Sequence, residues 1–370
     1  MPPTAQPTNT AAWIRTRNGA FEVGPAPCTP PGPDQIVVRN HAVAVNPLDW
    51  VIQVAGRVAY SWLTYPAVVG ADLAGEVVET GSAVTRFRAG DRVLALAVGT
   101  DRDVDSPAQG AFQQYTVVPE VLAAPIPASL SYRDAAVLPL GLSTAACSLF
   151  QTTHLGLRLP VAGAPPAGAT VLIWGGSTSV GVNAIQLAVA AGYDVITTAS
   201  PRNAGLLTDL GASRVCDYRS PTVEADIIET LSDRTPAGAV AIGLGAAPAC
   251  IRIAGASRGN RFVSVATAPV TFENGFSLPR TLTGMVGGVL RWQLAARRRG
   301  VRMKFVFGSD VKKNDVGPAI FRDFLPAALA EGRYRPLPRA SVVGTSLAGL
   351  QKALDQQRRG VSATKLVVEL

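Results

Sequence analysis

The chain has 370 residues, of which 48% are hydrophobic and only 16% are charged, and its formal net charge is +8. This composition excludes a disordered protein, which needs low hydrophobicity and high net charge, and the length corresponds to about two ordinary domains. The positive charge favours an anionic ligand or partner without identifying one.

The four cysteines are far apart and form no CxxC pair or Cys/His cluster. A disulfide framework and a structural zinc site are therefore not expected, and the sparse cysteines indicate a reduced, cytoplasmic compartment. The start of the chain lacks the pattern of a secretory signal. No charged residue lies between Arg158 and Asp194, but prolines, glycines and polar side chains in this stretch exclude a spanning helix, so we expect no membrane association.

Strand patterns separated by turns rich in Gly, Pro and Asp dominate the first 130 residues. Strands that follow one another without helices predict an antiparallel barrel or sandwich. The predicted strands are 11–16, 35–45, 74–79, 91–97 and 112–118.

Helices and strands alternate from residue 131 onward, which predicts a parallel, doubly wound sheet. After a helix over 131–150, interrupted at Pro139–Gly141, the predicted strands are 170–174, 194–199, 214–217, 239–243 and 261–266, and the helices are 180–191, 202–210 and 222–231. The tail returns to mixed structure, with helices at 316–331 and 346–359 and strands at 339–343 and 364–369. We therefore predict an α/β chain with a β-rich domain over 1–131, completed by 316–370, and a dinucleotide-binding domain over 132–315.

The strongest local signal is a glycine turn, VLIWGGSTSVG, at 171–181. A buried strand ends there and an apolar helix begins, so the free N–H groups and the positive dipole end of the helix suit a pyrophosphate. Glycines allow the sharp turn and the close packing of helix against sheet. The middle glycine of GxGxxG is absent, and an ordinary glycine-rich turn remains the alternative. The residues predicted to hold the pyrophosphate are Gly176, Ser177, Thr178, Ser179 and Val180.

The strand 194–199 runs into Ser200, Pro201, Arg202 and Asn203, with no acidic residue. NAD-specific sites carry an Asp or Glu there for the ribose 2′-hydroxyl. Ser200 can instead hydrogen-bond a 2′-phosphate and Arg202 can pair with it. Tyr218 could close over the same phosphate. The pattern favours NADP(H); the alternatives are a solvated Arg202 and a partly buried core Tyr218.

These features together resemble the medium-chain dehydrogenase/reductases. The resemblance covers nearly the whole chain and is closest to the zinc-independent branch of quinone-oxidoreductase-like proteins and fungal trans-acting enoyl reductases. It implies a GroES-like catalytic domain and a Rossmann domain. The matching stretches are Asn46–Trp50, Gly70–Gly75, Gly90–Val93, Gly110–Phe112 with Tyr115, Leu138–Thr144 and Gly211–Ala212 before Asp217–Tyr218.

The resemblance also bears on zinc. Zinc-dependent members present a Cys, a His–Glu pair and a second Cys or His, and the matching positions here are Asn46, Ala71–Asp72 and Leu140. Asp72 alone cannot hold zinc. The four-cysteine structural lobe of the family would fall near 95–112, which has no cysteine. We therefore predict that the protein binds no metal.

Without zinc, reduction of an activated C=C bond is easier than reduction of an isolated ketone, because charge delocalises onto the carbonyl oxygen. By family position, the catalytic candidates are Asn46, Asp49 and Trp50, where other members hold metal or substrate, and Thr144, near the nicotinamide ribose. The further residues expected beside the cofactor are Leu48, Val51, Val265, Ala266 and Phe307.

One departure concerns Val51, where relatives with the same motif usually have Lys. Valine removes a cation and a potential proton donor. Tyr60, Tyr65 and water are the open replacements. A structural interpretation of Asp49 and Trp50, as a helix cap and a packed aromatic, is equally open.

Residues 291–304 carry six cations and no acid. They are either a solvated helix face and loop or a docking patch for an acidic acyl-carrier domain or a CoA phosphate. Nucleic acid is not expected, because no aromatic-interleaved groove or binding module occurs.

The leading hypothesis is an NADPH-dependent, zinc-free reductase of an enone or enoyl thioester in secondary metabolism of the polyketide type. A broad quinone or enone reductase is the second hypothesis. A non-catalytic NADPH-binding protein is the third, and Val51 favours it.

Overall fold

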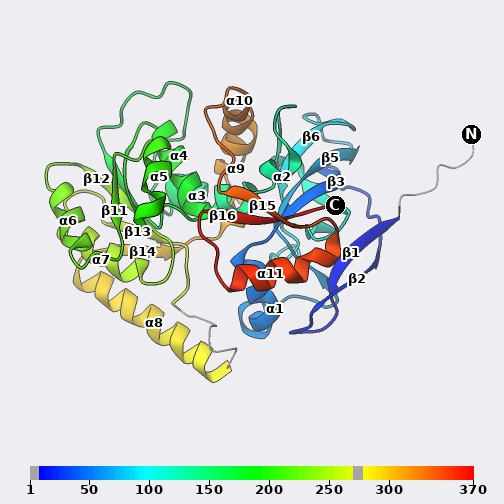
Figure 1. Ribbon diagram of the computed structural model, residues 1–370, viewed down its shortest axis with the longest axis horizontal. Helices are drawn as coiled ribbons and strands as arrows, with labels where there is room; N and C mark the ends of the chain where they lie inside the picture. Colours follow the sequence, from blue (N-terminus) through cyan, green and yellow to red (C-terminus); the bar gives the residue numbers. More distant parts are fainter. Residues whose placement is uncertain (1–7, 270–277) are drawn as a thin grey trace, which may run out of the picture. The chain divides into compact units, whose positions relative to one another are not determined.

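The computed structural model describes residues 8–269 and 278–370 (Figure 1). The chain forms two compact units, one of Met1–Leu140 with Phe321–Leu370 and one of Gly141–Ile320. The first boundary falls inside helix α3 (Pro139–Phe150). Among the described residues, no helix is long and apolar enough to cross a membrane.

Two sheets form the first unit. The small one has the order β2-β1-β4, and the large one has the order β15-β16-β3-β5-β6-β8, with β7 also paired to β3. Neighbours are antiparallel except β15 and β16, which are parallel. The C-terminal strand β16 therefore lies beside β3, from the start of the chain (Figure 1). The bounds are β1 Asn9–Ile14, β2 Phe21–Ala26, β3 Gln35–Ala44, β4 Ala67–Val68, β5 Asp72–Thr80, β6 Arg92–Leu96, β7 Tyr115–Pro119, β8 Ala123–Pro125, β15 Arg339–Gly344 and β16 Thr364–Glu369.

Helical segments complete the first unit, except that residues 316–320, which begin the last but one helical run, belong to the second unit. The predicted helix 316–331 is present as a continuous helical run over 316–330, and its middle segment 319–324 is a π-helix, followed by Pro326, which has no N–H to donate to the preceding turn. The break in the predicted helix 131–150 falls before Pro139, which starts α3. The bounds are α1 Pro47–Ala59, η1 Pro107–Gln109, η2 Glu120–Leu122, α2 Tyr132–Ala135, α9 Val316–Pro318, η5 Ala319–Phe324, α10 Leu325–Ala330, η6 Leu347–Gly349 and α11 Leu350–Arg358.

The second unit is built on the predicted parallel sheet, in the order β11-β10-β9-β12-β13-β14. The chain runs outward from β9 to β11, returns to β12 and runs outward to β14. The order reverses beside β9, which is where doubly wound sheets bind ligands. The bounds are β9 Thr170–Trp174, β10 Asp194–Ala199, β11 Arg214–Asp217, β12 Pro236–Ala241, β13 Phe262–Val265, β14 Arg302–Phe305, α4 Ser179–Ala190, η3 Pro201–Asn203, α5 Ala204–Asp209, α6 Val223–Thr230, α7 Ala246–Ala256, α8 Leu278–Arg298 and η4 Gly308–Lys313.

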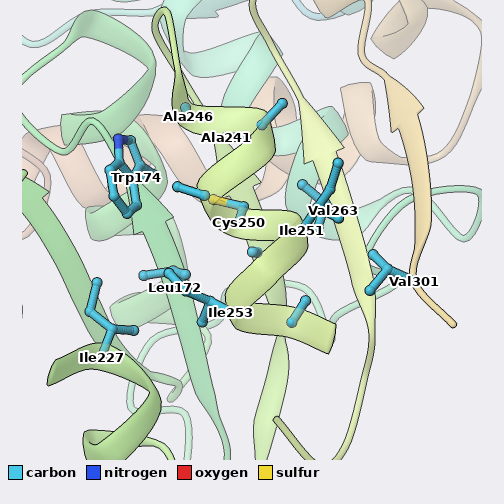
Figure 2. Close-up of a cluster of buried hydrophobic side chains, with 14 of the residues drawn as sticks. Leu172, Trp174, Ile227, Ala241, Ala246, Cys250, Ile251, Ile253, Val263 and Val301 are labelled. Atoms are coloured by element: carbon cyan, nitrogen blue, oxygen red, sulfur yellow. The ribbon is translucent and has the colours of Figure 1, made fainter. Parts of the chain in front are cut away.

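Helix α7, which the sequence patterns do not predict, supplies much of the core of this unit (Figure 2). Its side chains Cys250, Ile251 and Ile253 are each no more than 1% exposed and pack with strand residues such as Leu172 and Val263. Each such apolar side chain contributes roughly 1.5–3 kcal/mol by leaving water. The packed layer holds β9, β12 and β13 as a rigid base for the loops at their carboxyl ends.

Candidate functional site

The carboxyl ends of the parallel strands form one row. Register pairs Trp174 with Thr198 and Ala241, Ala241 with Val265, and Val265 with Phe305. The predicted cofactor residues of this unit follow directly from these ends, so the structure brings them to one edge of the sheet. They are Gly176–Val180 after β9, Ser200–Asn203 after β10, Tyr218 after β11, Val265 and Ala266 at the end of β13, and Phe307 after β14.

The glycine turn needs its glycines. Gly175 has a φ of +93°, a backbone conformation that other residues rarely adopt. A Cβ atom on Gly181 would lie 2.3 Å from the carbonyl oxygen of Gly175, and one on Gly176 would lie 2.2 Å from Oγ1 of Thr197. The N–H of Gly176 donates to the carbonyl of Thr198 at 2.9 Å, which ties the turn to β10. These glycines therefore allow a tight turn between the end of β9 and the start of α4.

Thr178, which stands near the missing middle glycine, is the N-cap of α4. Its Oγ1 accepts the N–H of Gly181 at 3.0 Å and donates to the carbonyl of Gly175 at 2.8 Å. The N–H groups of Ser179 and Val180, at the first helical positions, have no acceptor within the helix. They are suited to an anion, and the helix dipole adds a partial positive charge there.

Replacement of Thr178 by alanine is expected to lower the free energy of unfolding by about 1 kcal/mol, because an N-cap oxygen is lost. It should also weaken dinucleotide binding, because the first turn of α4 loosens. Thr178→Ser keeps the oxygen and should behave like the wild type. Urea unfolding and a dinucleotide titration followed by the fluorescence of the tryptophans, of which Trp174 precedes the turn, measure both effects. Equal stability of the alanine and serine variants would refute the capping role.

A polar cluster lies where β10 and β11 end side by side. The Tyr218 hydroxyl is hydrogen-bonded to Ser200, and this bond lowers the pKa of the phenol. The guanidinium of Arg219 lies 5.2 Å from the centre of the Tyr218 ring. The Arg219 backbone N–H donates to Oδ1 of Asp217 at 3.0 Å. Exposed Arg202 follows Ser200 in η3, so this edge carries two hydroxyls, two cations and the carboxylate of Asp217.

Arg219 was not predicted from the sequence. The available signal was its place directly after Tyr218, behind a strand that ends beside β10. A second cation there strengthens the electrostatic case for a phosphate.

Thr144 lies on α3, close to the start of α4. A Cβ atom on Gly141 would be only 3.0 Å from the carbonyl oxygen of Ser179, so α3 approaches the first turn of α4 at Gly141. Thr144 follows three residues later on the same side of the helix. Phe307, which follows the carboxyl end of β14, is 66% exposed. The positions of Thr144 and Phe307 suit contacts with a cofactor, and these contacts stay predictions.

The first unit contains a buried charged network. The ammonium of Lys365 lies 2.7 Å from Oδ2 of Asp72 and donates to Oδ1 of Asn46 at 2.5 Å. The Asn46 amide donates to Oδ2 of Asp72 at 2.8 Å, and the backbone N–H of Leu140 donates to Oδ1 of Asp72 at 2.6 Å. Asn46, Asp72 and Lys365 are all less than 5% exposed. Sequence reasoning found Asn46 and missed Lys365.

Asp49 and Trp50 have structural partners. The carboxylate of Asp49 accepts the backbone N–H of Asn46 at 2.7 Å, which caps the start of α1. Burial raises the pKa of Asp49 to about 7, against the lowering effect of that hydrogen bond. The indole N–H of Trp50 donates to Oε1 of Gln357 on α11 at 2.6 Å. These contacts support the structural interpretation, while the catalytic one stays a prediction. Leu48 and Val51 are partly exposed on α1.

Tyr60 and Tyr65 are both shielded phenols of the first unit. Burial raises the pKa of each above its ordinary value. Tyr60 ends α1 and packs against Trp62, with ring centres 5.0 Å apart. A raised pKa keeps these phenols protonated and makes them weaker acids.

The positions that match the family's zinc ligands do not fit a zinc ion. Leu140 offers only an aliphatic side chain, and the oxygens of Asn46 and Asp72 already bind the ammonium of Lys365. A dication placed among them would be repelled by that ammonium. Within the described part of the chain, no group of three or more His, Cys, Asp or Glu side chains could hold a metal.

Comparisons with known proteins agree with this fold. Residues 32–128 match the family described as the alcohol dehydrogenase GroES-like domain. The chain is 50% identical to the dehydrogenase pigH of Monascus ruber, over 98% of this chain and 100% of that protein. It is 37% identical to the trans-enoyl reductase himH of Aspergillus japonicus, over 98% and 97%. An alcohol dehydrogenase superfamily protein from Novosphingobium aromaticivorans has a similar structure, with a TM-score of 0.73, 26% identity and coverage of 98% and 100%.

Proposed function

Because this chain belongs to the medium-chain dehydrogenase/reductase superfamily, and is thus an oxidoreductase that takes a nicotinamide dinucleotide, we propose that it reduces a C=C bond conjugated to a carbonyl, in an enone or enoyl thioester, with NADPH. Its fold, a GroES-like unit and a Rossmann unit, is the predicted one. The ammonium at the zinc-ligand positions carries the proposal, because it leaves no Lewis acid to polarise an isolated ketone. The similarity to a trans-enoyl reductase supports it.

Each part of the cofactor has residues suited to hold it. The first turn of α4, with Gly176–Val180, would bind the pyrophosphate. Ser200–Asn203 with Tyr218 and Arg219 would bind the 2′-phosphate, and the absence of an acidic side chain from 200–203 supports NADPH. Bound NADPH supplies the hydride. Thr144, Val265, Ala266 and Phe307 would orient the nicotinamide and exclude water.

The proton that completes the reduction is a separate question. Val51 cannot donate one, and the raised pKa values of Tyr60 and Tyr65 make both phenols weak acids. We therefore propose that the proton reaches the α-carbon of the substrate from solvent.

NADPH oxidation at 340 nm across an enone, an enoyl thioester, a quinone and an unconjugated ketone tests the proposal. The enone and the thioester should be reduced and the ketone should not. Preference for the quinone would favour a broad quinone reductase, and tight NADPH binding without turnover would favour a non-catalytic protein. Reduction of the unconjugated ketone, or preference for NADH, would contradict the proposal. The cytoplasmic location stays a prediction.

An acidic acyl-carrier domain is the partner that we propose for α8. Residues 291–304 are the end of this helix, a turn and strand β14. Val286, Leu290 and Leu294 lie on one exposed side of the helix, each more than half exposed, and exposed Arg297 and Arg298 continue it. In a dimer formed through this face, the cations of one copy would repel those of the other, whereas an acidic surface complements them.

Charge reversal should separate carrier-bound from free substrate. Arg297→Glu with Arg298→Glu is expected to raise the KM for a carrier-bound thioester about tenfold or more, because the long-range attraction becomes repulsion. The kcat/KM for a small free enone should not change. Steady-state kinetics at low and high salt measure the effect. Equal losses with both substrates, or none, would refute the partner.

A further inference from the structure

The strand pairings place Lys365 next to Asp72. Ala44 of β3 lies between Asp72 of β5 and Val367 of β16. Residues opposite each other in a sheet point to the same face, and so do residues two apart in one strand. Lys365 therefore shares the face of Asp72, and the N–H of Val45 donates to the carbonyl of Leu366 at 3.0 Å to fix this register. The ion pair is built by the sheet and does not depend on a loop.

Two buried side-chain oxygens bind the ammonium of Lys365. Oδ1 of Asn46 lies 2.5 Å from Nζ and Oδ2 of Asp72 lies 2.7 Å from it, and the side chains of the ion pair are at most 4% exposed. Buried charges of this kind are stable only when paired and hydrogen-bonded. Asn46 in turn precedes the first residue of α1, whose start is capped by Asp49.

We propose that the ammonium of Lys365 is a built-in cation that takes the place of a catalytic metal ion, and that it holds Asn46 and Asp72 so as to position the start of α1. Lys365 is a positioning residue in this proposal, since it acts through Asn46. The inference deepens the zinc-free part of the proposed function.

Unfolding of paired variants tests the ion pair without any need for activity. Lys365→Met leaves Asp72 buried and unpaired, and its thermal midpoint should fall by about 10 °C. Asp72→Asn in the wild-type background should also lower it, because Lys365 then lacks its counter-ion. The double variant should recover at least half of the sum of the two losses, because the amide introduced by Asp72→Asn can bond the freed side-chain oxygen of Asn46. The control Lys352→Met, at an exposed position of α11, should leave the midpoint unchanged. Additive losses would overturn the proposal.

Zinc uptake and kinetics test the remaining two parts. Wild-type protein incubated with zinc sulfate and desalted should retain less than about a tenth of an equivalent of zinc. If it instead retains one equivalent, and Asp72→Asn retains none, the ammonium does not take the place of a metal ion. Measured well below its own midpoint, Lys365→Met should lose about tenfold or more in kcat with an enone, while its KM for NADPH changes less than about twofold. Unchanged kcat would overturn positioning. If the wild type reduces no acceptor, the proposed function fails, and the unfolding and zinc results still decide the ion pair.

Discussion

Replacing Arg202 and Arg219 together by alanine should raise the KM for NADPH about 100-fold or more and leave the KM for NADH within about twofold. Each charge-assisted bond to a phosphate contributes about 1.5–3 kcal/mol, and 1.4 kcal/mol corresponds to a factor of ten. NADH has no 2′-phosphate, so it does not use these contacts. The two arginines follow the ends of adjacent strands, beside the bonded hydroxyls of Ser200 and Tyr218.

Arg214 provides a matched control on the same strand. It is an exposed arginine at the opposite end of β11, bonded to Thr230. Arg214→Ala should leave the KM for both cofactors unchanged. Initial rates with an enone and varied NADPH or NADH give all the constants. A parallel rise in both KM values would assign the arginines to general stability, and no rise in either would remove the 2′-phosphate site from this edge.

The substitution Asp49→Asn should raise the free energy of unfolding at pH 8 and change it little at pH 4. Burial raises the folded-state pKa of Asp49 from an ordinary value of 3.8 to about 7. Between these values the folded state binds more protons than the unfolded state, so stability falls as the pH rises through this window. The full loss above pH 7 is on the order of 4 kcal/mol, at 1.36 kcal/mol for each pKa unit. The uncharged amide avoids this loss and still accepts the N–H of Asn46 through its oxygen.

Urea titrations of wild type and Asp49→Asn from pH 4 to pH 8 measure the difference. Asp323→Asn is a suitable comparison, because the pKa of exposed Asp323 is lowered by its hydrogen bond with Arg322. That variant should not gain stability at pH 8. If Asp49→Asn is no more stable than wild type at pH 8, burial does not raise the pKa of Asp49.

The parts of the fold that sequence reasoning predicted are those with local signals. The strand, glycine turn and helix at 170–191 and the parallel sheet around them follow from periodicity and from glycines that no other residue could replace. Helix α7 was missed because its small residues carry little periodic contrast, and β14 because a basic run obscures its short apolar pattern.

The candidate site was predictable where its residues are consecutive in the sequence. Ser200 and Arg202 follow one strand and could be found in this way. Arg219 comes directly after Tyr218, behind a strand whose predicted bounds 214–217 match β11, so its signal was available and was overlooked. Lys365 meets Asn46 across 319 sequence positions, and only the pairing of β16 with β3 brings them together. No motif around a lone lysine in a C-terminal strand indicates such a contact.

The return of β16 to the first unit also orders the events of protein synthesis. The second unit, Gly141–Ile320, is one continuous segment and can fold while the ribosome is still translating the tail. The first unit cannot, because residues 42–44 of β3 lack their neighbour on the β16 side and Asp72 lacks its counter-ion until β16 has been made. The N-terminal part of the first unit therefore cannot complete its fold until the C-terminal part has been made, and an unpaired strand edge is exposed until then. Ribosomes stalled before residue 364 should carry a folded second unit and a protease-sensitive first one.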